Sequence, residues 1–138
     1  MPGGDHGDAG ALALIRQLPP HTWALVTSAG RELATRRMQA AGLPLPGVMV
    51  CAEDVVCGKP HPGGYLQAAR WLAVSPTRCL VFEDAEAGIQ AGLASGALVI
   101  NVGADAGVTD ERCIYVSALD RLTVHSTSAV ISFAVTDP

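Results

Sequence analysis

The feature that most constrains this chain is the alternation of short apolar runs with longer amphipathic stretches. The runs are four to six residues long and rich in Val, Leu and Ile, which is typical of strands buried on both faces of a sheet. They are TWALVT (22–27), VMVC (48–51), CLVF (79–82), LVINV (98–102) and CIYV (113–116). Strands that alternate with helices indicate an α/β domain with a parallel sheet and right-handed crossovers.

The stretches between the runs predict helices. These helices cover residues 9–18, 31–41, 63–74 and 85–95. In the last of them Gly88 and Gly92 share one face, so we expect this helix to lie close against the sheet. Residues 123–135 alternate loosely and predict an edge strand or a hairpin. We expect residues 1–8, which are rich in Gly and Asp, to be loose, and residues 9–138 to form one domain.

Composition argues against several functional classes. The 138 residues carry nine Lys plus Arg against thirteen Asp plus Glu, a net charge of −4, with 4% aromatic residues. This balance argues against nucleic acid and anionic membrane surfaces as partners. No apolar run reaches the roughly 18 residues of a membrane span, and the first residues do not resemble a secretory signal. The four cysteines form no C-x-x-C pair, so we expect reduced thiols and a cytoplasmic protein.

Three polar clusters follow strands or crossovers, at the sheet edge where α/β proteins bind ligands. In the first, Thr27 and Ser28 end a strand and precede a helix. Two hydroxyls beside the free N–H groups of a helix N-terminus favour a bound anion. Taken alone, a capping role for Ser28 is the commoner explanation.

The second cluster is a loop that contains the only lysine of the chain, Lys59, among nine basic residues. Pro60 and Pro62 stiffen this loop and restrict the directions that the lysine side chain can take. A constrained ammonium group could neutralise a phosphate or a carboxylate. The alternative is an ordinary solvated lysine.

The third cluster is the acid pair Glu83 and Asp84, directly after CLVF. Adjacent carboxylates at the end of a buried strand repel each other, and Mg²⁺ would relieve that repulsion because it prefers oxygen ligands. The alternative is that both acids only complement the dipole of the helix that follows.

Together the three blocks LVTSAG, CGKPHPGGYLQAA and VFEDAEAGIQAGLASGALVI resemble motifs II, III and IV of the haloacid dehalogenase-like (HAD) hydrolase superfamily. The sequences of these blocks are most similar to the sugar-phosphatase, glycerol-phosphatase and β-phosphoglucomutase-like branch. The resemblance extends from about Ala9 to about Val102. The resemblance implies a Rossmannoid parallel sheet with flanking helices. It also implies a Mg²⁺-dependent phosphatase of a small phosphorylated metabolite, a sugar or polyol phosphate, that works through an aspartyl-phosphate.

The resemblance also assigns roles to residues. Thr27, Ser28 and Ala29 would bind the phosphate, with either Thr27 or Ser28 as the motif II hydroxyl. Lys59 would offset charge on the phosphate and the nucleophile. Asp84 would hold Mg²⁺, with Glu83 as the less secure second ligand.

One expected block is not found. The D-x-D-G-T motif, whose first Asp is the family's nucleophile, and the helical cap have no counterpart here. Asp5 and Asp8 are the only early acids, and no strand precedes them. We therefore interpret residues 9–138 as an incomplete core that lacks the strand between those carrying Thr27 and Asp84. The explanations that stay open are a truncated phosphatase, an inactive phosphate- or partner-binding paralogue, and a core completed by a separate N-terminal fragment.

Overall fold

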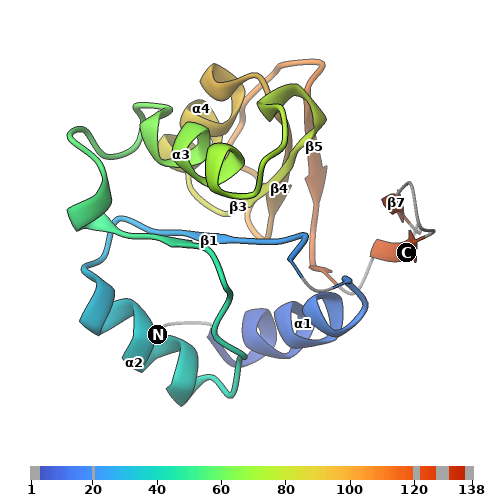
Figure 1. The fold of residues 1–138 in the computed structure, drawn as a ribbon. Helices are drawn as coiled ribbons and strands as arrows, with labels where there is room; N and C mark the ends of the chain where they lie inside the picture. The colour runs from blue at the N-terminus through green and yellow to red at the C-terminus, as the bar shows by residue number, and fades with distance from the viewer. Residues whose placement is uncertain (1–3, 20, 120–121, 127–130, 136–138) are drawn as a thin grey trace.

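A computed structural model describes residues 4–19, 21–119, 122–126 and 131–135 (Figure 1). Four helices and seven strands lie in these ranges, together with short 3₁₀ turns at Ala52–Asp54 and Pro76–Arg78. In chain order the elements are α1 (Gly4–Arg16), β1 (Leu25–Val26), α2 (Arg31–Ala40), β2 (Met49–Val50), α3 (Gly63–Trp71), β3 (Leu80–Glu83), α4 (Glu86–Ser95), β4 (Leu98–Val102), β5 (Cys113–Val116), β6 (Leu122–Ser126) and β7 (Ile131–Val135). The α/β class predicted from the alternating pattern is confirmed.

The strands of the core are parallel and fall into two groups. β1 pairs with β2, and β4 lies between β3 and β5 in a three-stranded sheet. Within the described residues β1 and β3 share no ladder. β6 and β7 form an antiparallel hairpin, so the hairpin alternative for the C-terminal segment is the correct one.

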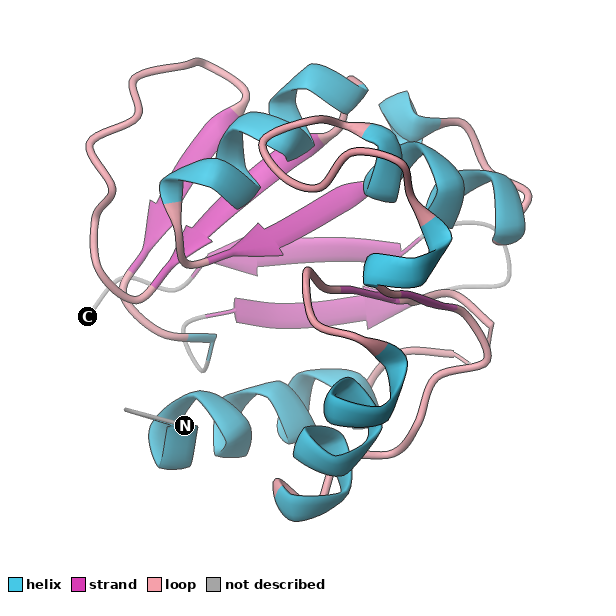
Figure 2. Ribbon diagram, turned by 90° about the vertical axis from the view of Figure 1, so that its left-hand side faces the viewer, coloured by secondary structure: helices cyan, strands magenta, loops and turns pink. Residues whose placement is uncertain are grey.

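Helices cover the strands from both sides (Figure 2). On one side α4 contacts β3, β4 and α3, and this contact is the apolar centre of the molecule. Its buried members are Val81, Ile89, Leu93, Ala97 and Val99. A smaller buried cluster on the opposite face of the three-stranded sheet is built on Ile100 and Val116.

Helix α3 connects the two groups of strands because it contacts α4, β1 and β2. Its first turn lies very close to β1, since a Cβ added at Gly64 would be 2.9 Å from Val26 Cγ1. Glycine at this position therefore permits the approach. As a result, the loop before α3 is held at the junction between the two groups of strands.

Several element boundaries differ from the sequence-based predictions. α1 begins at Gly4 and not at Ala9, so it includes most of the segment expected to be loose. Acidic residues such as Asp5 and Asp8 are favoured in the first turns of helices, a start signal that the apolar pattern did not include. β1 has two residues and not the predicted six, and within the described part of the chain it pairs only with the equally short β2. α3 ends at Trp71, and the chain then turns through a positive φ of 60° at Ala73.

Two compositional expectations can be compared with the structure. The four cysteines are free thiols, of which Cys51 is fully buried and Cys57 exposed. Among the described residues, no helix combines the length and the apolar character that crossing a membrane requires.

The close contact between α4 and the sheet predicts a sensitive position at Gly92. A Cβ there would lie 2.8 Å from Val99 Cγ2 and 3.2 Å from Val81 Cγ1. We expect Gly92→Ala to lower the free energy of unfolding by about 1–3 kcal/mol, since overpacking a core costs this much. Gly58→Ala is the control, because a Cβ there meets nothing within 4 Å, and it should change stability by less than about 0.5 kcal/mol. Urea denaturation measures both, and equal stability of the two variants would contradict the prediction.

Candidate active site

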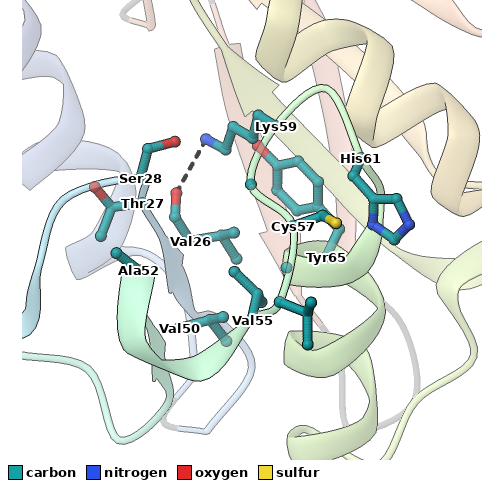
Figure 3. Close-up of a pocket in the computed structure, with 13 residues that line it drawn as sticks. Val26, Thr27, Ser28, Val50, Ala52, Val55, Cys57, Lys59, His61 and Tyr65 are labelled. Carbon is teal, nitrogen blue, oxygen red and sulfur yellow. Dashed lines mark hydrogen bonds between the residues drawn. The ribbon is translucent and has the colours of Figure 1, made fainter.

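A pocket of about 120 Å³ lies where the end of β1, the loop after β2 and the start of α3 meet (Figure 3). Its wall is mostly apolar, with hydroxyl, ammonium and phenol groups at one side. It is lined by Val26, Thr27, Ser28, Val50, Ala52, Val55, Val56, Cys57, Gly58, Lys59, His61, Gly64 and Tyr65. The first two of the three polar clusters predicted from sequence therefore contribute to one cavity.

Thr27 and Ser28 follow β1 and have different roles in the turn. The Thr27 Oγ1 accepts a hydrogen bond from the Ala29 N–H at 3.1 Å, and Ala29 is held in turn by the Ala52 N–H at 3.0 Å from its carbonyl oxygen. Ser28 is exposed, and its hydroxyl and the Lys59 amine point toward one another in Figure 3. Thr27 therefore shapes the turn, and Ser28 presents a hydroxyl to the pocket.

The capping explanation for Ser28 is wrong. The N-cap of α2 is Gly30, and it makes no side-chain cap. The carboxylate that receives the first-turn donor belongs to Glu53, whose oxygens accept from the Arg31 N–H at 3.0 and 3.1 Å. The Glu53 carboxylate thus accepts the hydrogen bond from the start of this helix, and Ser28 does not act as its cap.

Lys59 is not a solvated surface lysine. Its side chain is 18% exposed and pairs with the Glu83 carboxylate, whose side chain is 9% exposed. The Lys59 Nζ also donates to the Val26 carbonyl oxygen at 3.2 Å (Figure 3). The ammonium therefore connects β1 to the end of β3. This places a positive charge at the wall of the pocket.

Glu83 ends β3 and is held by two donors. Its Oε2 accepts from the Lys59 Nζ and from the Tyr65 hydroxyl. The carboxylate lies over Gly88 of α4, where an added Cβ would overlap with the Glu83 carboxyl group. The glycine predicted to allow close packing on the sheet thus makes room for this carboxylate.

Asp84 is placed differently from its neighbour. It is exposed and does not line the pocket, although it is near enough to Tyr65 to influence that phenol electrostatically. Among the described residues no group of three or more His, Cys, Asp or Glu side chains could hold a metal ion. Asp84 thus has an exposed carboxylate, whereas Glu83 is engaged by an ammonium and a phenol.

Tyr65 is a polar group of this site that the sequence did not reveal. Its ring packs against the main buried cluster. Burial raises the pKa of Tyr65 above its usual range, and the negative charge of Glu83 raises it further. Tyr65 is thus a stable hydrogen-bond donor. The clue in the sequence is that Tyr65 follows Lys59 closely, in the segment KPHPGGY where the predicted helix begins.

Asn101 was also missed. This side chain is 2% exposed at the end of β4. Its Nδ2 donates to the Ala104 carbonyl oxygen at 3.1 Å, and its Oδ1 accepts from the Ala106 N–H at 2.9 Å. A single polar residue inside the apolar run LVINV was the available signal, and its role is to fix the loop beside the sheet edge.

Asp5 and Asp8 belong to α1. Of the pocket-lining residues in the described part of the chain, none is an aspartate. The arrangement therefore offers groups that bind and neutralise an anion. It offers no carboxylate nucleophile from these residues.

Comparison with known proteins adds independent findings. A family model described as haloacid dehalogenase-like hydrolase matches residues 5–96. Hexitol phosphatase A of Escherichia coli (strain K12) is 43% identical over 119 residues, which are 83% of this chain and 55% of that protein. Glycerol-1-phosphate phosphohydrolase 2 of Saccharomyces cerevisiae is 37% identical over 95 residues, 64% of this chain and 38% of that protein. The chain thus spans about half or less of the length of these two relatives.

Solved structures show the same fold. The crystal structure of a HAD hydrolase, family IA, variant 3, from Entamoeba histolytica superposes with a TM-score of 0.65 at 22% identity. The superposition covers 85% of this chain and 56% of the other. The parallel strands and flanking helices described above are thus the arrangement of a known fold.

The raised pKa of Tyr65 predicts an alkaline effect on stability. Because the folded state holds this proton more tightly than the unfolded chain, the stability it contributes is present below the unfolded pKa of about 10 and is lost as pH rises above it. We therefore expect the free energy of unfolding of the wild type to fall more steeply above pH 10 than that of Tyr65→Phe. Urea denaturation at several pH values measures this, with Tyr115→Phe as the matched control. Parallel curves for the wild type and Tyr65→Phe would refute it.

Proposed function

Because this chain belongs to the haloacid dehalogenase-like hydrolase family, we propose that its pocket receives the phosphoryl group of a small phosphorylated metabolite. The observation that carries the proposal is the position of the Lys59 ammonium, at the wall of a pocket that also contains the Thr27 and Ser28 hydroxyls. A phosphate would bring negative charge and several acceptor oxygens to this wall, and the wall supplies a cation and hydroxyl donors.

The proposed substrate class is a sugar or polyol phosphate. Its support is the similarity to proteins named hexitol phosphatase and glycerol-1-phosphate phosphohydrolase, which are 43% and 37% identical to this chain over the aligned residues. The proposed reaction is hydrolysis of the phosphate ester through an aspartyl-phosphate.

In this reaction the residues of the chain have distinct roles. Ser28 and Thr27 would donate to phosphoryl oxygens, and the Ala29 turn would hold both hydroxyls in position. Lys59 would offset the charge that builds up as the phosphoryl group moves, which is the main form of catalysis in phosphoryl transfer. The nucleophilic aspartate would come from outside the described pocket lining, which contains none.

We also propose Mg²⁺ as the cofactor, with Asp84 as the ligand and Glu83 as a second ligand. When bound, the ion would polarise a phosphoryl oxygen and offset its charge. Asp84 is exposed and free for such a role. Glu83 could join it only if Lys59 and Tyr65 shared or released its carboxylate.

A second candidate is a protein that binds phosphate without turning it over. The observation in its favour is the same pocket lining, which combines an ammonium and two hydroxyls with no aspartate among the described residues. Both candidates predict phosphate binding, and only the first predicts turnover once a carboxylate nucleophile is present.

Removing the lysine charge tests phosphate binding. We expect Lys59→Met to weaken the binding of inorganic phosphate at least tenfold, since a charge-assisted hydrogen bond is worth about 1.5–3 kcal/mol. The control is Arg70→Met, which removes the same charge from an exposed position of α3 that does not line the pocket. Titration calorimetry with phosphate measures both variants. Equal phosphate affinity of Lys59→Met and wild type would eliminate the proposed site.

Turnover separates the two candidates. We expect the 138-residue chain alone to hydrolyse no p-nitrophenyl phosphate above a buffer blank in the presence of Mg²⁺, since positioned charges cannot replace a covalent nucleophile. Addition of a polypeptide that carries a D-x-D-G-T strand should produce turnover, and Asp84→Asn should abolish that turnover. Glu86→Gln, which removes a neighbouring exposed acid, should retain it. Turnover by the chain alone that is lost in Asp5→Asn or Asp8→Asn would show that the nucleophile lies in α1.

A further inference from the structure

Tyr65 contacts both members of the ion pair at the pocket. Its hydroxyl donates to the Glu83 Oε2, and the Lys59 Nζ lies 5.3 Å from the centre of its ring. A cation at this distance over an aromatic face is attracted by the ring electrons. One side chain thus binds the carboxylate through its edge and the ammonium through its face.

The position of the ring is fixed by the fold. Tyr65 lies in the first turn of α3, next to the glycine that brings this helix against β1. Its ring packs against the buried cluster of α4 and the sheet. The ring is therefore a rigid support, whereas a lysine side chain by itself has four rotatable bonds.

A second consequence follows from the shared acceptor. The Tyr65 hydroxyl and the Lys59 ammonium donate to the same oxygen of Glu83. Part of the acceptor capacity of this oxygen is thus used by a neutral donor, which weakens the hold of Glu83 on the ammonium. Without the hydroxyl, the carboxylate would interact with Lys59 alone among the described side-chain donors.

We propose that Tyr65 is a positioning residue that holds Lys59 at the pocket wall and limits its pairing with Glu83, so that the ammonium stays available to a phosphate. This inference rests on the proposed function and adds a residue to it. Tyr65 does not need to touch the substrate. It acts by fixing the position of Lys59 and by keeping the Lys59 ammonium available.

The single lysine makes the test direct. In protein labelled with ¹³C and ¹⁵N only at lysine, the side-chain spectrum reports Lys59 alone. We expect Tyr65→Phe to shift this signal, because the ring remains while the hydroxyl that competes for Glu83 is gone. The same variant should bind inorganic phosphate three- to tenfold more weakly than wild type. Tyr115→Phe is the matched control, since the Tyr115 hydroxyl donates to the Gly103 carbonyl oxygen and does not line the pocket. It should change neither measurement.

The outcomes distinguish this inference from the proposed function. A Lys59 signal and a phosphate affinity in Tyr65→Phe equal to wild type, with binding lost in Lys59→Met, would overturn the role of Tyr65 and leave the phosphate site in place. Phosphate binding unaffected by Lys59→Met would overturn the phosphate site, and the role of Tyr65 with it. If the role of Tyr65 were purely structural, Tyr65→Phe would have a lower melting temperature but an unchanged Lys59 signal. That result would refute the proposal.

Discussion

The arrangement of the site depends on the ion pair between Lys59 and Glu83. The parallel strands among the described residues form two groups with no ladder between β1 and β3, and the lysine reaches from one group to the other. Its ammonium donates to the Val26 carbonyl oxygen of β1 and pairs with the carboxylate that ends β3. A single side chain thus relates the turn after β1, which carries the pocket hydroxyls, to the strand end that carries the acid pair.

A pair this well shielded is stable only because its other hydrogen-bonding capacity is used. Removing two charges from water costs several kcal/mol for each ion, and mutual attraction repays that cost only with additional hydrogen bonds. Here the carbonyl of Val26 accepts from the ammonium and the phenol of Tyr65 donates to the carboxylate. Gly88 contributes by leaving open the space that the carboxylate fills. The stability of the ion pair therefore depends both on these polar groups and on the absence of a side chain at Gly88.

The sequence predicted the elements and the location of the site better than its contacts. Alternating apolar runs were enough for the α/β class, and the lone lysine in a proline-framed loop was enough to single out Lys59. The partner of Lys59 could not be predicted, because it depends on how closely α3 and α4 approach β3. The resemblance implied Glu83 as the less secure metal ligand beside Asp84, and the hydrogen bonds that Glu83 accepts from Lys59 and Tyr65 were not predicted. Tyr65 could not be identified from the sequence, because the hydrogen bond from its hydroxyl to Glu83 depends on tertiary packing.

The hydrogen bond from Lys59 to the Val26 carbonyl oxygen also occupies an acceptor on the open edge of β1 among the described residues. Thr27 and Leu25 direct their N–H groups to β2, and the alternation along a strand directs Val26 toward the opposite edge, which is unpaired among the described residues. An open strand edge is a template for pairing with another chain, and a charged lysine is a common protection of such edges. The Lys59 ammonium already donates to the Val26 acceptor on this edge. A second strand could therefore pair with β1 at Val26 only by displacing the ammonium.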